Sequence, residues 1–264
     1  MTDVHSLAIR FADLWAVNHH QMVDEIYAPT IHMESMAALE RPPVEGAEEL
    51  HALEYRLAAM IPQHRHELIR LIPGDRVSCL ETMVVGPTTA EYAPACVWWW
   101  VDAQGEVAYE VGWFDWEVRS TDSHVSHGLV PPNDHRRRGD DGWYRMFAEG
   151  LADGLIADPR MALTRLLAPG CVVEVVGDGP GSDIGAAVSG LHRIEVHEVA
   201  CDGAVVAILF TAGDDERVSR GTFVLTLDGE DRATSLRAYW RWTLAVRADA
   251  VHPSLHLALP GSLK

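Results

Sequence analysis

The sequence predicts an α+β protein built from two tandem copies of one domain, and three observations lead to this fold class. A strand–turn–strand pattern covers Trp98–Arg119, where Asp102-Ala103-Gln104-Gly105 supplies residues that favour a tight turn. A weaker copy of this pattern, again with an Asp-Gly turn, covers Arg220–Arg247. The order of predicted helices and strands repeats after about 130–140 residues, a period that is too long for a solenoid and typical of tandem domains.

The first copy starts with helices and ends with antiparallel strands. Apolar residues at helical spacing predict the helices, and alternation of apolar and polar residues predicts the strands. The helices cover Val4–Val17, His20–Tyr27 and Ala47–Met60. The strands cover Thr30–Met36, His64–Ile72, Val77–Val85, Ala93–Val101 and Glu106–Val118.

The second copy repeats this order in a shorter form. Its predicted helices cover Trp143–Gly154 and a segment that Asp158-Pro159 opens as an N-cap and first-turn pair. Leu167-Ala168-Pro169 matches Tyr27-Ala28-Pro29, because in both copies the residue before proline ends a helix. The long third helix of the first copy shrinks to Asp183–Ser189.

A change of composition separates the two copies. Pro131-Pro132-Asn133 and the basic run Arg136-Arg137-Arg138 are typical of a linker. We therefore expect a domain with a candidate pocket over 1–120, a linker over 121–141, a second and degenerate domain over 142–247, and a tail over 248–264.

Composition excludes several classes of function. The formal net charge of −18 disfavours binding to nucleic-acid phosphates or to an anionic membrane surface. Lys264 is the only lysine, which excludes lysine-based covalent catalysis elsewhere in the chain. The N-terminus has no signal-peptide pattern and the four cysteines have no CxxC spacing, so we expect a cytoplasmic protein with buried free thiols. Without a glycine-rich nucleotide loop or metal-ligand spacing, we expect no cofactor and no metal.

A set of residues stands at corresponding places in the two copies. In the first copy these are Phe11, Trp15, Tyr27-Ala28-Pro29, Glu34, Gly46 and Val101-Asp102-Ala103-Gln104-Gly105. In the second copy they are Leu167-Ala168-Pro169, Glu174, Asp228-Gly229 and Ala238-Tyr239-Trp240. Together with the order of elements, this pattern resembles the nuclear transport factor 2-like fold, which includes SnoaL-like polyketide cyclases, ketosteroid isomerases and limonene-type epoxide hydrolases. The resemblance implies two tandem cone-shaped α+β barrel domains, each with a curved, mostly antiparallel sheet wrapped around helices and an apolar pocket.

The resemblance also allows the activities of this group to be compared with the chain. Ketosteroid isomerases use a Tyr and two Asp at three positions that are inert here, so that mechanism is disfavoured. These positions hold Phe11, Ser35 and Val97. Limonene-type epoxide hydrolases need an Asp-Arg-Asp set that holds a water. The nearest set here is Glu81 with Asp115 or Glu110, without an arginine placed between them.

Carboxylates of the first domain are the expected catalytic groups, because a carboxylate in an apolar cone has a raised pKa and can act as acid or base near neutral pH. Glu110 interrupts an apolar strand, Glu81 interrupts another, and Glu34 falls beside the base position of the family. An outward orientation on the strand is the alternative for each of them. The predicted catalytic residues are Glu34, Glu110, His66 and Glu81. The predicted substrate-binding residues are Phe11, Trp15, Val97, Trp99, Phe114 and Trp116.

These residues favour a SnoaL-like enzyme that performs cofactor-free acid–base chemistry on an apolar polyketide- or terpenoid-like substrate, by cyclisation, isomerisation, dehydration or epoxide opening. The alternative is a non-catalytic ligand-binding or scaffolding protein with a degenerate pocket. The orientation of Glu34 and Glu110 discriminates between the enzyme and the non-catalytic protein, because the enzyme requires both side chains to point into one closed cavity. Trp98 and Trp100 fall on the strand face opposite Trp99 and predict an apolar surface that packs against the second domain or forms a homodimer.

Overall fold

The computed structural model describes residues 4–60, 63, 65–74, 77–86, 92–114, 139–176, 179–180 and 183–255. These residues form two compact units. The first unit comprises the described residues of 1–35 and 42–130, and the second comprises 36–41 and those of 131–264. Residues 36–41 belong to the second unit, although they lie within the first copy of the repeat in sequence.

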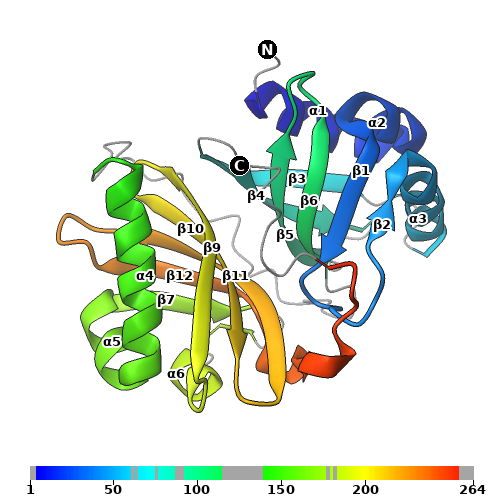
Figure 1. Ribbon diagram of the computed structural model, residues 1–264. Helices are drawn as coiled ribbons and strands as arrows, with labels where there is room; N and C mark the ends of the chain where they lie inside the picture. The colour runs from blue at the N-terminus through cyan, green and yellow to red at the C-terminus, as the bar shows by residue number, and fades with distance from the viewer. Residues whose placement is uncertain are drawn as a thin grey trace. The chain divides into compact units, whose positions relative to one another are not determined.

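The first unit combines helices with a six-stranded sheet in the described part of the chain (Figure 1). The helices are α1 (Val4–Val17), α2 (His19–Ile26) and α3 (Gly46–Met60). The strands are β1 (Tyr27–Ser35), β2 (Val44–Glu45), β3 (Arg65–Pro73), β4 (Val77–Val85), β5 (Tyr92–Val101) and β6 (Val107–Phe114). Their order in the sheet is β2-β1-β6-β5-β4-β3, with β1 parallel to β6 and the other pairs antiparallel.

Local sequence explains where several of these elements begin and end. The side chain of Asn18 caps α2 by accepting a hydrogen bond from the backbone N–H of Gln21 over 3.1 Å. Strand β1 follows α2 directly, because Tyr27 already has extended backbone. In the β5–β6 turn, Asp102 Oδ1 accepts from two backbone N–H groups and Gly105 has a φ of 88°, so the predicted tight turn is present.

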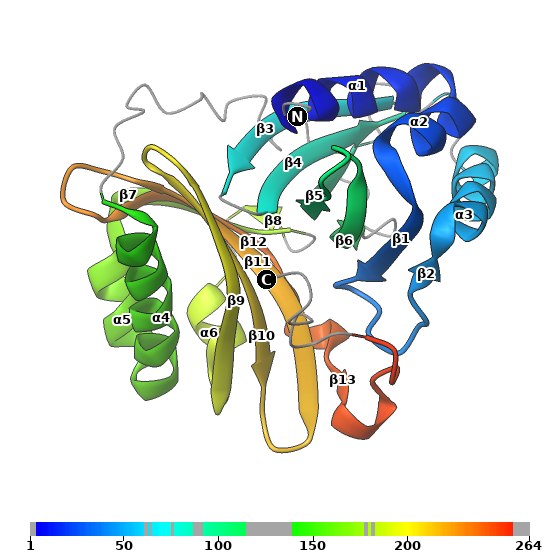
Figure 2. The same ribbon diagram turned by 45° about the horizontal axis from the view of Figure 1, so that its top comes forward.

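The two faces of this sheet have different neighbours, and we call them inner and outer. Helices α1 and α3 pack on the inner face, and α2 packs against both of them (Figure 2). Leu80, Val97 and Trp99 belong to the apolar core of the first unit and mark the inner face. Trp98 and Trp100, one residue away on β5, mark the outer face. Both are buried, with 0% and 4% of their surface exposed.

The second unit repeats this architecture. Its helices are α4 (Asp141–Ala157), α5 (Pro159–Leu166) and α6 (Ile184–Val188). Its strands are β7 (Leu167–Val175), β8 (Gly179–Pro180), β9 (Arg193–Asp202), β10 (Val205–Gly213), β11 (Arg217–Leu227), β12 (Ala233–Tyr239) and β13 (Val246–Arg247). The order β8-β7-β12-β11-β10-β9 corresponds strand by strand to the first unit, and β12 is parallel to β7 as β6 is to β1. The prediction of an α+β fold in two tandem copies is thereby confirmed.

Packing in the second unit follows the same plan, since α4 lies along the sheet and contacts β9 (Figure 2). The guanidinium of Arg145 on α4 donates to the carbonyl oxygens of Val196 and His197, over 3.0 and 2.7 Å. These residues lie where the β9–β10 register shifts, so Arg145 satisfies backbone acceptors at an irregular part of the sheet. In the segment 36–41, Leu39 is buried with Val218 and Leu255.

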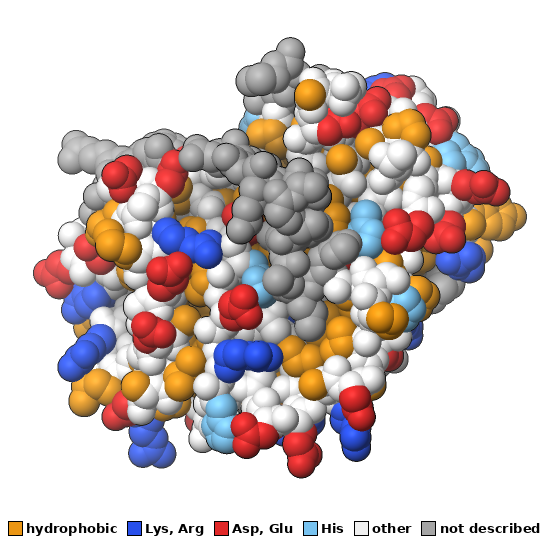
Figure 3. All heavy atoms as spheres, in the orientation of Figure 1, with side chains coloured by type: hydrophobic (Ala, Val, Ile, Leu, Met, Phe, Trp, Pro, Cys, Tyr) orange, Lys and Arg blue, Asp and Glu red, His pale blue; other side chains and the backbone are white. Residues whose placement is uncertain are grey.

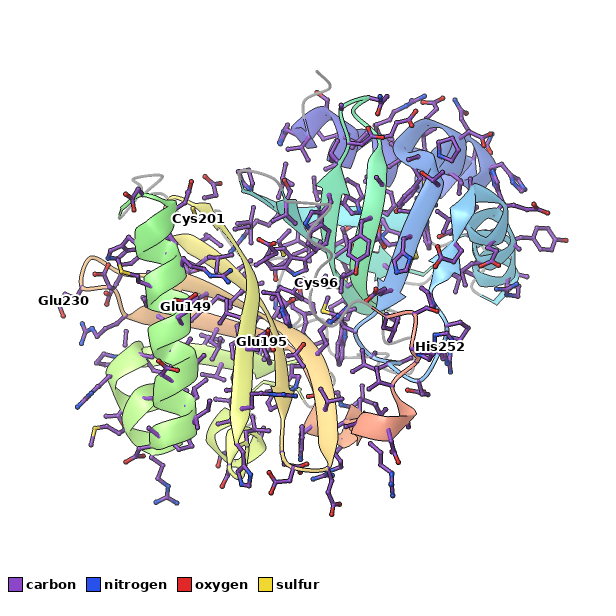
Figure 4. The ribbon with its side chains drawn as sticks, in the orientation of Figure 1. Cys96, Glu149, Glu195, Cys201, Glu230 and His252 are labelled. Carbon is purple, nitrogen blue, oxygen red and sulfur yellow. The ribbon has the colours of Figure 1, made fainter. Side chains whose placement is uncertain are left out.

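The described surface is acidic and the thiols are free, but Cys171 is only half-buried, which differs from the expectation that all four thiols are buried. Acidic side chains are spread over the visible surface of both units (Figure 3). The four cysteines are free, and Cys96 on β5 lies with its Sγ 3.5 Å from that of Cys79 on β4 (Figure 4). Among the described helices, none has the length and apolar character needed to cross a membrane.

Candidate active site in the first unit

Glu110 lies at the centre of the inner face, where only 1% of its surface is exposed. It stands on β6 directly opposite Trp99 of β5. Its Oε2 atom accepts two hydrogen bonds, from the hydroxyl of Tyr27 over 2.9 Å and from Nε1 of Trp99 over 2.7 Å. Its Oε1 atom is buried and has no hydrogen-bond partner among the described residues. A buried polar atom without a partner is rare in folded proteins and is often explained by catalysis or by a bound ligand or water.

The surroundings of Glu110 place its pKa near neutrality. Burial raises the pKa of this carboxyl from 4.5 to about 7, against the two hydrogen bonds from Tyr27 and Trp99, which lower it. The negative charge of Glu54 raises it further. A carboxyl with such a pKa is present in both protonation states near neutral pH, as acid–base chemistry requires.

Tyr27 is a site residue that sequence reasoning treated only as part of a helix-ending motif. It is the first residue of β1 and is buried, with 4% of its surface exposed. Burial and the nearby charges of Glu110 and Glu54 hold the pKa of its phenol well above its usual value of 10.0. The hydroxyl therefore keeps its proton and serves as a permanent donor to Glu110. The signal in the sequence was a tyrosine at the junction of a helix and a strand, where a hydroxyl can enter the core.

Aromatic side chains line the interior beside this carboxyl. Phe11 and Trp15 stand four residues apart on α1 and so share one side of the helix. The ring of Phe11 makes edge contacts with His66 and Trp99, with centroids 5.2 and 5.3 Å apart. Trp15 contacts His66 at 3.7 Å. The structure thus brings together four of the predicted site residues with Glu110 on one face of the sheet.

The remaining predicted residues of the inner face are only partly described. Val97 is buried in the same core cluster as Trp99. His66 lies with its Nδ1 3.2 Å from Oγ1 of Thr82. Phe114 ends β6, but its side chain lies outside the described residues, as does the whole of Trp116.

Glu34 lies on the opposite side of the sheet from Glu110. In the parallel β1–β6 pair, Glu34 stands opposite Val111, the neighbour of Glu110, and side chains alternate along a strand. Its Oε1 atom accepts from the hydroxyl of Tyr109 over 2.8 Å and from Nε2 of His32 over 2.9 Å. Both carboxylates are buried, but the structure does not bring them together.

His32 bridges Glu34 to a second carboxylate at the surface. Its Nδ1 lies 3.0 Å from Oε1 of Glu45, so both ring nitrogens face carboxylate oxygens and both must carry protons to donate. Burial lowers the pKa of His32, but its hydrogen bonds and charge interactions with Glu34 and Glu45 outweigh burial and raise it above 6.5. Glu34 is therefore half of a buried ion pair, a chemical setting unlike that of Glu110.

Glu81 also lies on the outer face. Its neighbour Leu80 belongs to the inner core, so Glu81 points the other way. The carboxylate is fully buried and its Oε2 lies 3.8 Å from Nε of Arg70, which is itself only 9% exposed. Glu81 and Arg70 form a buried pair on the face opposite to Glu110.

The interior of the second unit is almost filled by apolar side chains. It contains a cavity of about 10 Å³, which is close to the space of one water molecule. Apolar residues from α4 and the sheet line it, namely Ala148, Leu151, Ala152, Leu155, Ile194, Val196, Ile208, Phe210 and Phe223. Glu174 at the position matching Glu34 bonds to Nε of Arg237 over 2.9 Å. Within the part of the chain that is described, no group of three or more His, Cys, Asp or Glu residues could hold a metal ion.

Comparisons with known proteins place the likeness at the level of fold. No protein-family model and no curated protein matches the chain. Solved structures do match. One is a hypothetical protein with a ketosteroid isomerase-like fold from Catenulispora acidiphila, in complex with trimethylamine, at 12% identity over 41% of this chain and 85% of that chain, with a TM-score of 0.36.

Two further matches carry the SnoaL-like description. A candidate SnoaL-like polyketide cyclase from Jannaschia is 13% identical over 42% of this chain and 84% of its own, with a TM-score of 0.37. A SnoaL-like protein of unknown function from Burkholderia thailandensis is 16% identical over 44% and 98%, also with a TM-score of 0.37. Each of these three matches covers less than half of this chain.

Proposed function

We propose that the first unit is a SnoaL-like enzyme that performs acid–base chemistry on an apolar small molecule without a cofactor. Glu110 is the group that takes and returns the proton. The observation that carries this proposal is its asymmetric carboxyl, in which Oε2 is held by two donors while the buried Oε1 has no hydrogen-bond partner among the described residues.

The two oxygens of Glu110 then have separate tasks. Tyr27 and Trp99 fix the carboxyl plane through Oε2 and favour its ionised form, since hydrogen bonds to a charged acceptor are the stronger ones. Oε1 removes a proton from the substrate, and the carboxylic acid that results returns the proton to another atom of the same molecule. This exchange suits a pKa near 7, because neither direction of transfer is strongly uphill.

The aromatic side chains beside Glu110 define the kind of substrate. Phe11, Trp15 and Trp99 are each at most 4% exposed and present rings to the same interior. Rings of this kind bind apolar or unsaturated carbon skeletons and keep water from the carboxyl. A polyketide- or terpenoid-like compound with an acidified C–H bond fits these surroundings.

Among the four reactions considered, isomerisation, cyclisation and dehydration are supported better than epoxide opening. Epoxide hydrolysis of the limonene type needs an arginine between two carboxylates around a water. Among the described residues of the first unit, the arginine that is buried is Arg70, and it pairs with Glu81 on the outer face. The other three reactions need one carboxyl that moves a proton, which Glu110 supplies.

Proton exchange at carbon tests the proposal without knowledge of the natural substrate. β-Tetralone is an apolar ketone whose α-protons exchange in deuterated water, and proton NMR follows the loss of their signal. We expect the wild-type protein to accelerate this exchange and Glu110→Gln to remove the acceleration. If the two proteins behave alike, the non-catalytic ligand-binding alternative is favoured.

A further inference from the structure

A second carboxylate, Glu54, enters the interior of the first unit from α3. Leu50, four residues earlier on the helix, is fully buried in the core cluster that contains Tyr27 and Trp99. Residues four apart on a helix share one face, so Glu54 points toward the same core. It is 7% exposed, whereas Glu48 on the same helix is exposed. A buried carboxylate in such a position costs free energy unless a partner or a function offsets it.

His19 of α2 is the titratable neighbour of Glu54. Its Nδ1 lies 3.7 Å from Oε2 of Glu54, which is within ion-pair range but too long for a hydrogen bond. Oε2 of Glu54 has no hydrogen-bond partner in the described part of the chain. The His19 side chain is 24% exposed, and its ring contacts Trp15 with centroids 5.0 Å apart. The pair therefore connects the aromatic interior with the surface.

The negative charge of Glu54 acts on the carboxyl of Glu110. It raises the pKa of Glu110 and also that of Tyr27, which bonds to Glu110. Among the titratable groups, His19 from α2 lies within ion-pair distance of Glu54, and Tyr27 and Glu110 are the groups whose pKa its charge raises. His51, on the same helix as Glu54, bonds instead to Asp24 on α2 over 2.9 Å.

We propose that Glu54 is a positioning residue of this site, a second buried carboxylate that is held beside His19 in the interior of the first unit and whose negative charge opposes the ionisation of Glu110. Two carboxylates in one interior disfavour double ionisation, so one of them holds a proton more tightly than it would alone. The meaning of Glu54 for catalysis rests on the proposed function of Glu110. The electrostatic link between the two residues can be measured independently of turnover.

Trp99 provides the readout for this link. Its indole N–H donates to Oε2 of Glu110, and the bond strengthens when the carboxyl ionises. The proton resonance of this indole N–H should therefore move with pH as Glu110 titrates. Glu110→Gln identifies the signal, because in that variant the movement is lost. The titration is followed by NMR on the full-length protein between about pH 5 and pH 9, around the pKa range that a buried carboxyl reaches.

Glu54→Gln should lower the midpoint of this titration by about half a pH unit or more, because it removes one nearby negative charge. Glu54→Leu should give the same shift, and it continues the apolar side of α3, so one of the two variants folds even if a buried amide is not tolerated. Glu54→Asp keeps the charge and should restore most of the midpoint. Glu48→Gln is the matched control, which removes an exposed charge from the same helix and should leave the midpoint unchanged.

The inference is overturned if Glu54→Gln and Glu54→Leu titrate like the wild type and Glu48→Gln. It is also overturned if the Trp99 resonance of the wild type does not titrate in this range. Failure of the proposed function has a different signature, namely wild-type exchange of β-tetralone protons by Glu110→Gln while the Trp99 titration is normal.

Discussion

The hydroxyl of Tyr27 donates to Oε2 of Glu110 over 2.9 Å, which joins the start of β1 to the middle of β6 through the interior of the first unit. On the other face of the same two strands, the tyrosine lies on β6 and the carboxylate on β1. There the hydroxyl of Tyr109 donates to Glu34 over 2.8 Å. The two pairs differ in their surroundings. Glu34 also binds His32, which carries positive charge, whereas the donors to Glu110 are neutral. Around Glu110, burial raises the pKa of the carboxyl to about 7.

Removing the Tyr27 hydroxyl should raise the pKa of Glu110. The hydrogen bond from Tyr27 lowers this pKa, so Tyr27→Phe leaves burial opposed only by Trp99. We expect the midpoint of the Trp99 indole titration to move upward, opposite in sign to the shift for Glu54→Gln. Above this midpoint the variant should lose roughly 1.5–3 kcal/mol of stability, the range for a hydrogen bond to a charged group. A downward or absent shift would show that Tyr27 does not control this carboxyl.

Glu110 should make the first unit less stable as the pH rises. Its pKa is about 7 in the folded protein and 4.5 as a free group, so between these values the unfolded chain loses its proton first. Stability falls through this window by up to roughly 3 kcal/mol and then levels off. Glu110→Gln cannot ionise and should be the more stable protein above about pH 7, with an advantage that shrinks toward pH 4. Hydrogen exchange of β5 and β6 amides at several pH values measures this difference, and parallel pH profiles would contradict it.

His32 should stabilise the first unit in the opposite pH direction. Its folded pKa lies above 6.5 because its pairing with Glu34 and Glu45 outweighs burial, which acts in the other direction. The stabilisation is fully present below the unfolded value and is lost as the pH rises through the folded value. His32→Gln should therefore cost more stability near pH 6 than near pH 9. Urea denaturation at both pH values tests this expectation, and an equal cost at both would refute the assignment of a charged imidazole.

His197 should make the second unit sensitive to acid. Burial, followed by the charges of Arg220 and Arg145, lowers its pKa from 6.5 to about 4. The folded state then binds fewer protons than the unfolded state, and stability is lost as the pH falls through this window, by up to roughly 3 kcal/mol. His197→Gln should remove most of this loss while leaving a polar group next to Thr211. Hydrogen exchange of β9 and β10 amides, measured near pH 7 and near pH 4.5, reports the loss of stability in the wild type and in His197→Gln. Equal losses in the two proteins would show that His197 is not buried as a neutral ring.

The architecture could be predicted from sequence because its signals are local. Runs of mainly apolar residues mark β4 and β5, the turn residues Asp102–Gly105 lie between β5 and β6, and the same order recurs in the second unit. The boundaries of α2 and β1 differ from the prediction by a few residues, because Tyr27 has extended backbone before Pro29. That residues 36–41 belong to the second unit is a tertiary fact without a local signal.

Only part of the candidate site could be predicted from the sequence. Glu110 could be found because a charged residue interrupts an apolar strand. Whether Glu34 and Glu110 share a face was left open by the sequence, since their faces depend on the parallel register in which Glu34 meets Val111. Glu54 escaped notice because a Glu on an amphipathic helix resembles a solvent-exposed residue until the packing of α3 is known.

Ring opening of nitrobenzisoxazole tests the central claim most directly, because this apolar compound reports proton removal from carbon by a buried carboxylate through the colour of its product. We predict that the wild-type protein accelerates the reaction, with a rate that rises through about pH 7 as Glu110 ionises. Glu110→Gln should lower this rate by about 10²-fold or more, the usual contribution of a general base. Glu34→Gln, a buried carboxylate of the same strand pair on the outer face, should keep it. Equal rates for the wild type and Glu110→Gln would contradict the assignment of Glu110 as the proton-transferring group.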